Sequence, residues 1–306
     1  MRKLFRIAPV LAVLALGAAF IRPDIPVEEL KPKYAPPPSQ FMSLDGMEVH
    51  YRDEGEGPAL VLLHGTGASL HTWDGWVEAL ADSFRVVRLD LPGFGLTGPN
   101  PAHDYRIATY VDFLEHFVGR LGLERFSLAG NSLGGHIAWR YALAHPQRVE
   151  KLILIDPAGA PDDAPDPFVF KLARTPVANR LLTVVTPRSL MEKSLREVYA
   201  DDAKVTPALV DRYYELSLRE GNRAAFVARA RTVEPNRFDQ IAYVRAPTLI
   251  LWGKQDVWIP VATARRFTER LPHAVLVTYP DAGHVPMEER PARTAADARR
   301  FLTARP

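Results

Sequence analysis

Residues 126–135 read Phe-Ser-Leu-Ala-Gly-Asn-Ser-Leu-Gly-Gly, and this stretch decides the fold. A short apolar run breaks into Gly-x-Ser-x-Gly around Ser132 and then continues with the spacing of a helix. Gly130 and Gly134 remove the Cβ atoms that would clash in a sharp turn from strand to helix. Such a turn projects the Ser132 hydroxyl clear of the sheet, and the Leu133 N–H at the start of the helix points toward the same place. The stretch therefore predicts an accessible nucleophilic serine beside a hydrogen-bond donor for an oxyanion.

Short apolar runs alternate with helical patterns on both sides of this turn. Asp45-Gly46 separates the first two runs and predicts a hairpin, while the later runs are continuously apolar, as in strands covered on both faces. This alternation predicts an α/β fold with a mostly parallel, doubly wound sheet, whose site forms at the carboxyl ends of the strands. The predicted strands are 41–44, 47–52, 59–63, 84–89, 126–129, 152–155, 248–252 and 274–278, and the main predicted helices are 108–121, 133–145, 261–271 and 290–303.

The alternation is interrupted between residues 156 and 247, where no buried-strand run occurs. This region instead carries helical patterns, at 168–173, 178–185, 189–199, 207–218 and 223–230. We interpret it as a helical cap, residues 158–238, inserted into a core made of residues 41–157 and 239–306. Such a cap is expected to lie over the strand ends and to shape the substrate site.

Chemically distinctive residues follow several predicted strands. His64-Gly65-Thr66-Gly67 follows one of them, and its glycines let the Thr66 N–H turn toward the Leu133 N–H, so that the two form an oxyanion hole. Asp256 and His284 follow the last two strands. Ser132, Asp256 and His284 thus occur in the order nucleophile, acid, base. His284 would take the proton of Ser132 during attack, and Asp256 would fix the imidazole tautomer.

Other polar residues are interpreted as structural. Asp90 and Asp156 also end predicted strands, and we expect them to hydrogen-bond within their own loops. His136 lies one helical turn after Ser132 and is expected to face along the helix. The histidines without a motif around them are predicted to lie on the surface: His50, His71, His103, His116, His145 and His273.

Composition excludes several classes of function. The chain has no cysteine, which excludes disulfides and thiolate chemistry, and no His-rich motif suggests a bound metal. The net charge of +2 provides no basic field for nucleic acid. The first 21 residues place three cations before an uncharged apolar run from residue 7 to residue 21, the plan of a secretory signal.

This apolar run spans roughly 22 Å as a helix, short of a hydrocarbon core of ~30 Å, so a cleaved signal peptide and an uncleaved membrane anchor formed by residues 4–21 both stay open. A buried N-terminal helix is the third alternative. Residues 22–38 carry six prolines in seventeen residues, and we interpret 22–40 as an extended tether. We expect an exported, periplasmic domain in contact with the inner membrane through its N-terminal segment.

The motifs described above resemble those of the α/β-hydrolase superfamily over residues 41–304, and the N-terminal signal resembles its exported bacterial lipase and esterase branch. The resemblance implies an α/β-hydrolase fold that hydrolyses carboxylic esters through an acyl-Ser132 intermediate and needs no cofactor. Apolar cap residues, with Phe168, Phe170, Met191 and Phe226 as the candidates for substrate binding, suit a short- to medium-chain acyl group.

Related branches define the alternatives. Haloalkane dehalogenases and epoxide hydrolases use aspartate as the nucleophile, so Ser132 argues against both. Carbon–carbon hydrolases of meta-cleavage products share the Gly-Asn-Ser-x-Gly-Gly pattern but usually carry tryptophan directly after the catalytic histidine, where this chain has Val285. A catalytically silent binding protein with this fold is the remaining alternative, although such proteins usually lose a residue of the triad.

Overall fold

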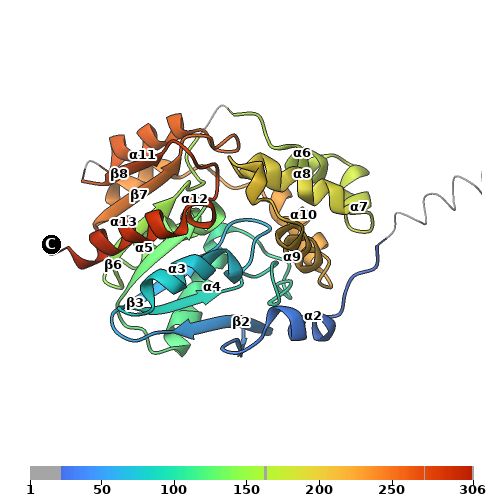
Figure 1. The fold of residues 1–306 in the computed structure, drawn as a ribbon, viewed down its shortest axis with the longest axis horizontal. Helices are drawn as coiled ribbons and strands as arrows, with labels where there is room; N and C mark the ends of the chain where they lie inside the picture. Colours follow the sequence, from blue (N-terminus) through green and yellow to red (C-terminus); the bar gives the residue numbers. More distant parts are fainter. Residues whose placement is uncertain (1–21, 162–163, 272, 305–306) are drawn as a thin grey trace, which may run out of the picture.

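The computed structural model describes residues 22–161, 164–271 and 273–304 of the 306-residue chain (Figure 1). The predicted signal peptide or membrane anchor, residues 1–21, lies outside the described residues. None of the helices in the described ranges is long and apolar enough to cross a bilayer.

One eight-stranded sheet runs through the molecule in the order β1-β2-β4-β3-β5-β6-β7-β8. β1 and β2 form the predicted hairpin across Asp45 and Gly46, which both have positive φ as a tight hairpin turn requires. β2 also pairs antiparallel with β4, and all later pairs are parallel, so the predicted fold class is confirmed. The strands are β1 (Gln40–Leu44), β2 (Met47–Glu54), β3 (Ala59–Leu63), β4 (Arg85–Leu89), β5 (Phe126–Asn131), β6 (Val149–Ile155), β7 (Thr248–Gly253) and β8 (Val275–Tyr279).

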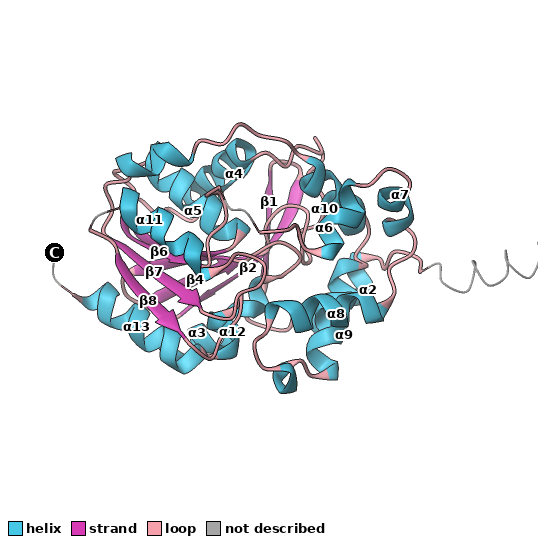
Figure 2. Cartoon of the chain, turned by 90° about the horizontal axis from the view of Figure 1, so that it is seen from above, coloured by secondary structure: helices cyan, strands magenta, loops and turns pink. Residues whose placement is uncertain are grey.

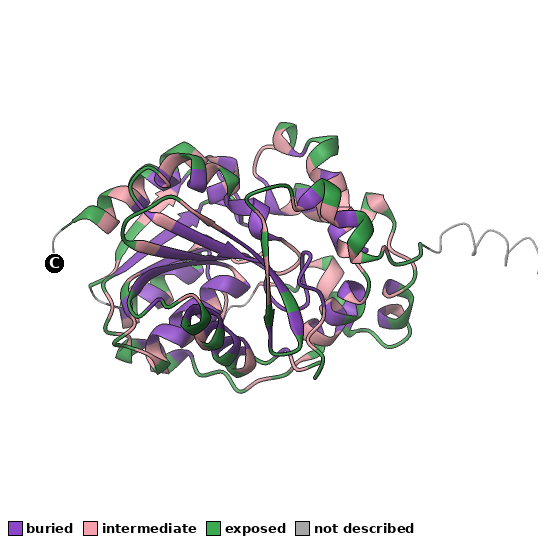
Figure 3. Ribbon diagram, turned by 90° about the horizontal axis from the view of Figure 1, so that it is seen from below, coloured by how far each residue is buried: buried purple, intermediate pink, exposed green. Residues whose placement is uncertain are grey.

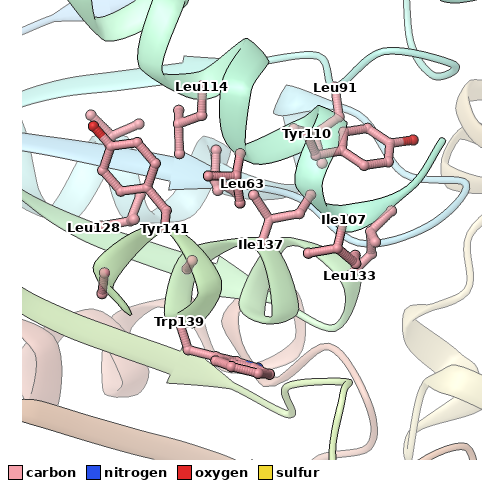
Figure 4. Close-up of a cluster of buried hydrophobic side chains, with 14 of the residues drawn as sticks. Leu63, Leu91, Ile107, Tyr110, Leu114, Leu128, Leu133, Ile137, Trp139 and Tyr141 are labelled. Carbon is pink, nitrogen blue, oxygen red and sulfur yellow. The ribbon is translucent and has the colours of Figure 1, made fainter. Parts of the chain in front are cut away.

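Helices cover both faces of this sheet, as its buried central strands require (Figures 2 and 3). Side chains from one face of β5, such as Leu128, pack with the helices α4 and α5, whereas Ala129 on the other face packs with α3 and α13. Figure 4 shows part of the apolar cluster between the sheet and the helices α4 and α5, where Leu63 and Leu128 lie near Leu114 and Ile137. The flanking helices are α3 (Asp74–Leu80), α4 (Ile107–Arg120), α5 (Leu133–Ala144), α11 (Ala264–Arg270), α12 (Pro286–Glu289) and α13 (Pro291–Thr303).

In the described residues between β6 and β7, five α-helices follow one another along the chain. They gather at one end of the sheet (Figure 1). They are α6 (Phe168–Arg174), α7 (Ala178–Leu182), α8 (Arg188–Val198), α9 (Pro207–Ser217) and α10 (Asn222–Arg231). We call the segment 158–238 the cap. In its described residues the cap adds no strand to the sheet, which agrees with its helical sequence pattern.

The segment 22–40 is not the extended tether that we predicted from its prolines. It contains the helix α2 (Val27–Tyr34), which begins after Pro26 with two acidic residues in its first turn. Leu30 and Tyr34 lie one turn apart on this helix and pack with Leu216 of the cap. The interpretation failed because this pair of apolar side chains, spaced to face one way, outweighs the extended preference of the flanking prolines.

Candidate active site

Ser132 lies in the sharp turn between β5 and α5, and its backbone has a positive φ of 51°. A side chain rarely adopts this conformation, and strained residues of this kind cluster at functional sites. The two flanking glycines are required by close packing. A Cβ on Gly130 would lie 2.2 Å from the Gly134 carbonyl oxygen, and one on Gly134 would lie 2.2 Å from the Leu63 carbonyl oxygen. The geometry presents the serine at the start of a helix, directly under the cap.

Asp256 and His284 follow β7 and β8, and their side chains are in contact. His284 Nδ1 lies 2.6 Å from Asp256 Oδ2, and both residues are buried. The other carboxylate oxygen, Oδ1, accepts the N–H groups of Trp258 at 2.8 Å and Ile259 at 2.9 Å. Because the carboxylate only accepts, Nδ1 carries the proton, and Nε2 is left as the basic nitrogen. This is the tautomer that a general base needs.

Ser132 and His284 line the same cavity beneath the cap. The wall of this cavity is mainly apolar, with Val169, Leu190, Leu195 and Val285 among its lining residues. A second, more polar cavity shares Ser132 and His284 with the first, and Asp166, Arg174 and Arg229 line it. An apolar cavity and a more polar cavity therefore both extend from Ser132.

The two candidate oxyanion donors lie beside Ser132. Leu133 is the first residue of α5, so its N–H belongs to the unpaired first turn of that helix. The loop that carries Thr66 packs against the serine turn, since a Cβ on Gly65 would lie 3.2 Å from the Ser132 Cβ. Thr66 also lines both cavities.

Three of the four candidate substrate-binding residues line the apolar cavity: Phe170, Met191 and Phe226. The prediction for Phe168 is wrong, because its side chain is 47% exposed and does not line either cavity at Ser132. Residues two apart on a helix point in nearly opposite directions, so α6 cannot turn both Phe168 and Phe170 inward. The Phe168 ring instead lies against the Lys193 ammonium group, 4.7 Å from its centroid.

Sequence reasoning missed two residues that hold the His284 loop. Asn131 donates from Nδ2 to the His284 carbonyl at 3.0 Å and to the Ile155 carbonyl at 3.1 Å. Its signal in the sequence is a polar side chain at the end of an otherwise buried strand. Glu289 is buried and accepts the Gly283 N–H at 2.6 Å through Oε1.

Glu289 also reaches the cap. Its Oε2 accepts the Ala200 N–H at 2.9 Å, and the His284 N–H donates to the Val198 carbonyl at 2.7 Å. Burial raises the pKa of Glu289, although the N–H groups of Gly283 and Ala200 oppose the shift. The end of α8 and the loop that carries His284 are thus joined by a buried carboxyl. Its place five residues after His284 in a charged stretch gave no indication of burial.

Asp90 has the structural role that we predicted, and it involves two histidines that we placed wrongly. Asp90 accepts the N–H groups of Leu70 at 2.7 Å and Leu96 at 2.8 Å, and His50 Nδ1 lies 2.7 Å from it. Burial opposes its ionisation, but the neighbouring His50 holds the Asp90 pKa below its usual range. His50 and His71 are buried here and not on the surface, because each ring nitrogen has a hydrogen-bond partner.

Comparison with known proteins places the chain in a family. Residues 58–291 match the family described as alpha/beta hydrolase fold, and the chain belongs to that family. It is 30% identical to 2-hydroxy-6-oxononadienedioate/2-hydroxy-6-oxononatrienedioate hydrolase 2 of Pseudomonas putida, over 78% of this chain and 85% of that protein. It is 31% identical to the pimeloyl-[acyl-carrier protein] methyl ester esterase of Nitrosomonas europaea, over 78% of this chain and 93% of that protein.

A solved structure resembles almost the whole chain. The crystal structure of a membrane phospholipase A, described as a bacterial virulence factor, superposes with a TM-score of 0.73 at 30% identity. The match covers 98% of this chain and 97% of that one. These similar proteins include both ester hydrolases and a hydrolase of an oxo-dienedioate. Membership of the family therefore indicates a hydrolase, but the bond that it cleaves has to be inferred from the site.

Proposed function

We propose that this protein is a serine hydrolase that cleaves carboxylic esters. The observation that supports this most directly is that His284, which pairs with Asp256, lines the same cavity as Ser132, whose backbone is strained. In the proposed reaction, Ser132 Oγ attacks the ester carbonyl while His284 Nε2 takes its proton. The N–H groups of Thr66 and Leu133 stabilise the oxyanion. His284 then protonates the leaving alcohol, and a water deacylates Ser132 in the reverse sense.

Each of the two cavities is proposed to bind one part of the substrate. The apolar cavity under α6, α8 and α10 suits the acyl chain, and the cavity that Asp166, Arg174 and Arg229 line suits a polar alcohol group. We infer an amphiphilic ester with a short- to medium-chain acyl group. The similarity to a membrane phospholipase A supports an alcohol group that includes a phosphate.

Carbon–carbon bond hydrolysis is the second candidate. The Asn131-Ser132 pair and the similarity to the Pseudomonas putida hydrolase favour it. Val285, which occupies the position after the catalytic histidine, favours the ester reaction. A serine-directed fluorophosphonate tests for the nucleophile in both cases. We expect an adduct on Ser132 in the wild type and none in Ser132→Ala or His284→Ala.

Substrate series then separate the reactions. We expect turnover of p-nitrophenyl esters from acetate to decanoate, with a maximum at intermediate chain length, and no cleavage of a 2-hydroxy-6-oxo-dienoate. Turnover of the dienoate alone would establish the second candidate. A folded wild type that is neither labelled nor active would indicate a binding protein.

We also propose that the protein is exported and faces the periplasm, with residues 1–21 as signal peptide or inner-membrane anchor. The support is the three cations ahead of an apolar run, together with a similarity to a membrane protein that extends over 98% of the chain. External protease applied to spheroplasts should digest the domain, whereas a cytosolic control protein survives. Recovery of the intact protein in the cytosolic fraction would contradict the proposal.

A further inference from the structure

Asp156 is a buried carboxyl at the centre of the molecule that the proposed mechanism does not use. It follows β6, the neighbour of the strand that precedes Asp256, and no part of it is exposed. Its backbone is strained, with φ at 42°. The parallel sheet therefore brings two aspartates to adjacent strand ends.

The hydrogen bonds of Asp156 are incomplete. Oδ1 accepts the Gly253 N–H at 3.0 Å, whereas Oδ2 is buried and has no hydrogen-bond partner in the described part of the chain. A buried carboxylate oxygen without a donor is costly, but a carboxylic acid can place its own proton there and donate it. The neighbouring acceptors decide where such a proton would go.

Those neighbours are the acid and the base of the triad. One ligand atom each from Asp156, Asp256 and His284 lies within 4.8 Å of the other two. Asp256, His284 and the carboxyl of Glu289 are the titratable groups that face Asp156. Burial first, and then the charge of Asp256, raise the pKa of Asp156 well above its usual range. The unpartnered Oδ2 and the raised pKa both favour a proton on Asp156.

We propose that Asp156 is a second acid of the catalytic centre, a positioning residue that donates a hydrogen bond to Asp256 and replaces it as the partner of His284 when Asp256 is removed. In the wild type, the proton on Asp156 steadies the Asp256 carboxylate, which already accepts from His284 and two N–H groups. Without Asp256, the like charge is gone. Burial still opposes ionisation of Asp156, but the positive charge of the His284 imidazolium favours it, so that Asp156 can itself hold the imidazolium.

A double-mutant cycle tests this role, which rests on the proposed hydrolysis. We expect Asp156→Asn alone to stay within about threefold of wild-type kcat/KM, because the amide still donates to Asp256 and accepts from Gly253. Asp256→Ala should lose about 10²-fold, and Asp256→Ala with Asp156→Asn about 10⁴-fold, the usual cost of a missing triad acid. Asp156→Asn is therefore expected to lower kcat/KM by a far larger factor in the Asp256→Ala background than in the wild type. A merely structural Asp156 would cost the same factor in both backgrounds, and that result would overturn the proposal.

Asp281→Asn is the matched control, since this carboxyl lies three residues before His284 but is half-exposed and paired with Arg290. It should have the same small effect in both backgrounds. Proton NMR gives a readout that needs no turnover. The downfield His284 Nδ1–H resonance should persist in Asp256→Ala and vanish in the double variant, and its absence from folded Asp256→Ala would refute the replacement. If the wild type hydrolyses nothing, the proposed function fails, while the resonance still tests the carboxyl pair.

Discussion

The side chain of Glu289 connects the loop that carries His284 to the end of α8. Its two oxygens accept N–H groups from Gly283 and Ala200, and the carboxyl itself is buried. Replacing Glu289 with alanine leaves these donors without a partner. We expect the free energy of unfolding to fall by about 2–4 kcal/mol and kcat to fall about tenfold with little change in KM.

Chemical denaturation and steady-state kinetics check this prediction. Glu289→Gln should recover part of the stability, because its amide oxygen still accepts one of the two N–H groups. Glu269→Gln, on the exposed face of α11, is the control and should change neither quantity. An unchanged kcat in Glu289→Ala would show that the loop of His284 does not depend on this link.

His71 makes stability depend on pH in a defined direction. Burial lowers its pKa to about 4 from 6.5, so the native state resists a proton that the unfolded chain accepts. The stabilisation is complete above pH 6.5 and is lost as the pH falls toward 4, with a limit of about 3 kcal/mol. Unfolding free energies measured across this interval should decrease on acidification.

His71→Gln should make that dependence shallower, and the exposed His103→Gln should leave it unchanged. Some slope should remain, because burial also lowers the pKa of His136, to about 3. An equal slope in wild type and His71→Gln would disprove the assignment.

At the level of single residues, the sequence predicts the features that local turn chemistry determines. The glycines around Ser132 and the polar residues after the strands are local signals, so the candidates for nucleophile, acid and base were found without coordinates. The partners of Glu289 and Asp156 come from segments far apart in the sequence, and no local pattern encodes that approach. His50 and His71 were misplaced for the same reason, because hydrogen bonds to Asp90 and the Tyr34 carbonyl allow their burial.

At the level of elements, α6 presents two aromatic rings in opposite directions. Phe170 lines the apolar cavity and packs against Phe226 and Trp258, whereas Phe168 faces outward. Phe170→Ala should raise KM for medium-chain esters by about 10- to 100-fold, in keeping with the loss of apolar contacts worth about 1–3 kcal/mol. Phe168→Ala serves as the matched control and should stay within about twofold. Comparable effects of the two substitutions on KM would contradict the orientation of α6, in which Phe170 faces the cavity and Phe168 faces outward.

The boundaries of the elements show where sequence patterns are informative. The run 59–63 coincides with β3, whose residues are almost all buried, but β6 begins at Val149, three residues before the predicted start. Glu150 and Lys151 conceal this beginning, because the strand extends past its apolar core with two charged residues, of which Glu150 is exposed and Lys151 is half-buried. The helix α2 was missed because its apolar residues are buried by the cap, a contact between segments far apart in the sequence that no local pattern indicates.

For the whole molecule, the position of Arg22 predicts an orientation at a membrane. The Arg22 N–H donates to the Val184 carbonyl at 3.0 Å, next to α7, where Val177, Leu181 and Val184 are exposed. If residues 1–21 enter a bilayer, this apolar face of α7 lies against it. β8 lies at the other end of the molecule (Figures 1 and 2).

The lack of cysteine in the chain allows a direct test of this orientation. A fluorophore on Leu181→Cys of the full chain, reconstituted in vesicles of phosphatidylcholine and phosphatidylglycerol, should be quenched by brominated lipid. The same fluorophore on Val275→Cys, an exposed position on β8, should not. Equal quenching at both positions, or none at Leu181, would contradict the orientation.

The N-terminal segment is fastened to the cap and not only to the sheet. Asp24 pairs with the buried Arg223 at 2.6 Å, and the Ile25 N–H donates to the Leu218 carbonyl at 2.7 Å, just before α10. Arg223 also lines the apolar cavity. If residues 1–21 enter a bilayer, tension on them reaches the cap over Ser132 through these contacts. Under that condition, we expect lateral stress in the bilayer to change how readily a substrate enters, without any effector molecule.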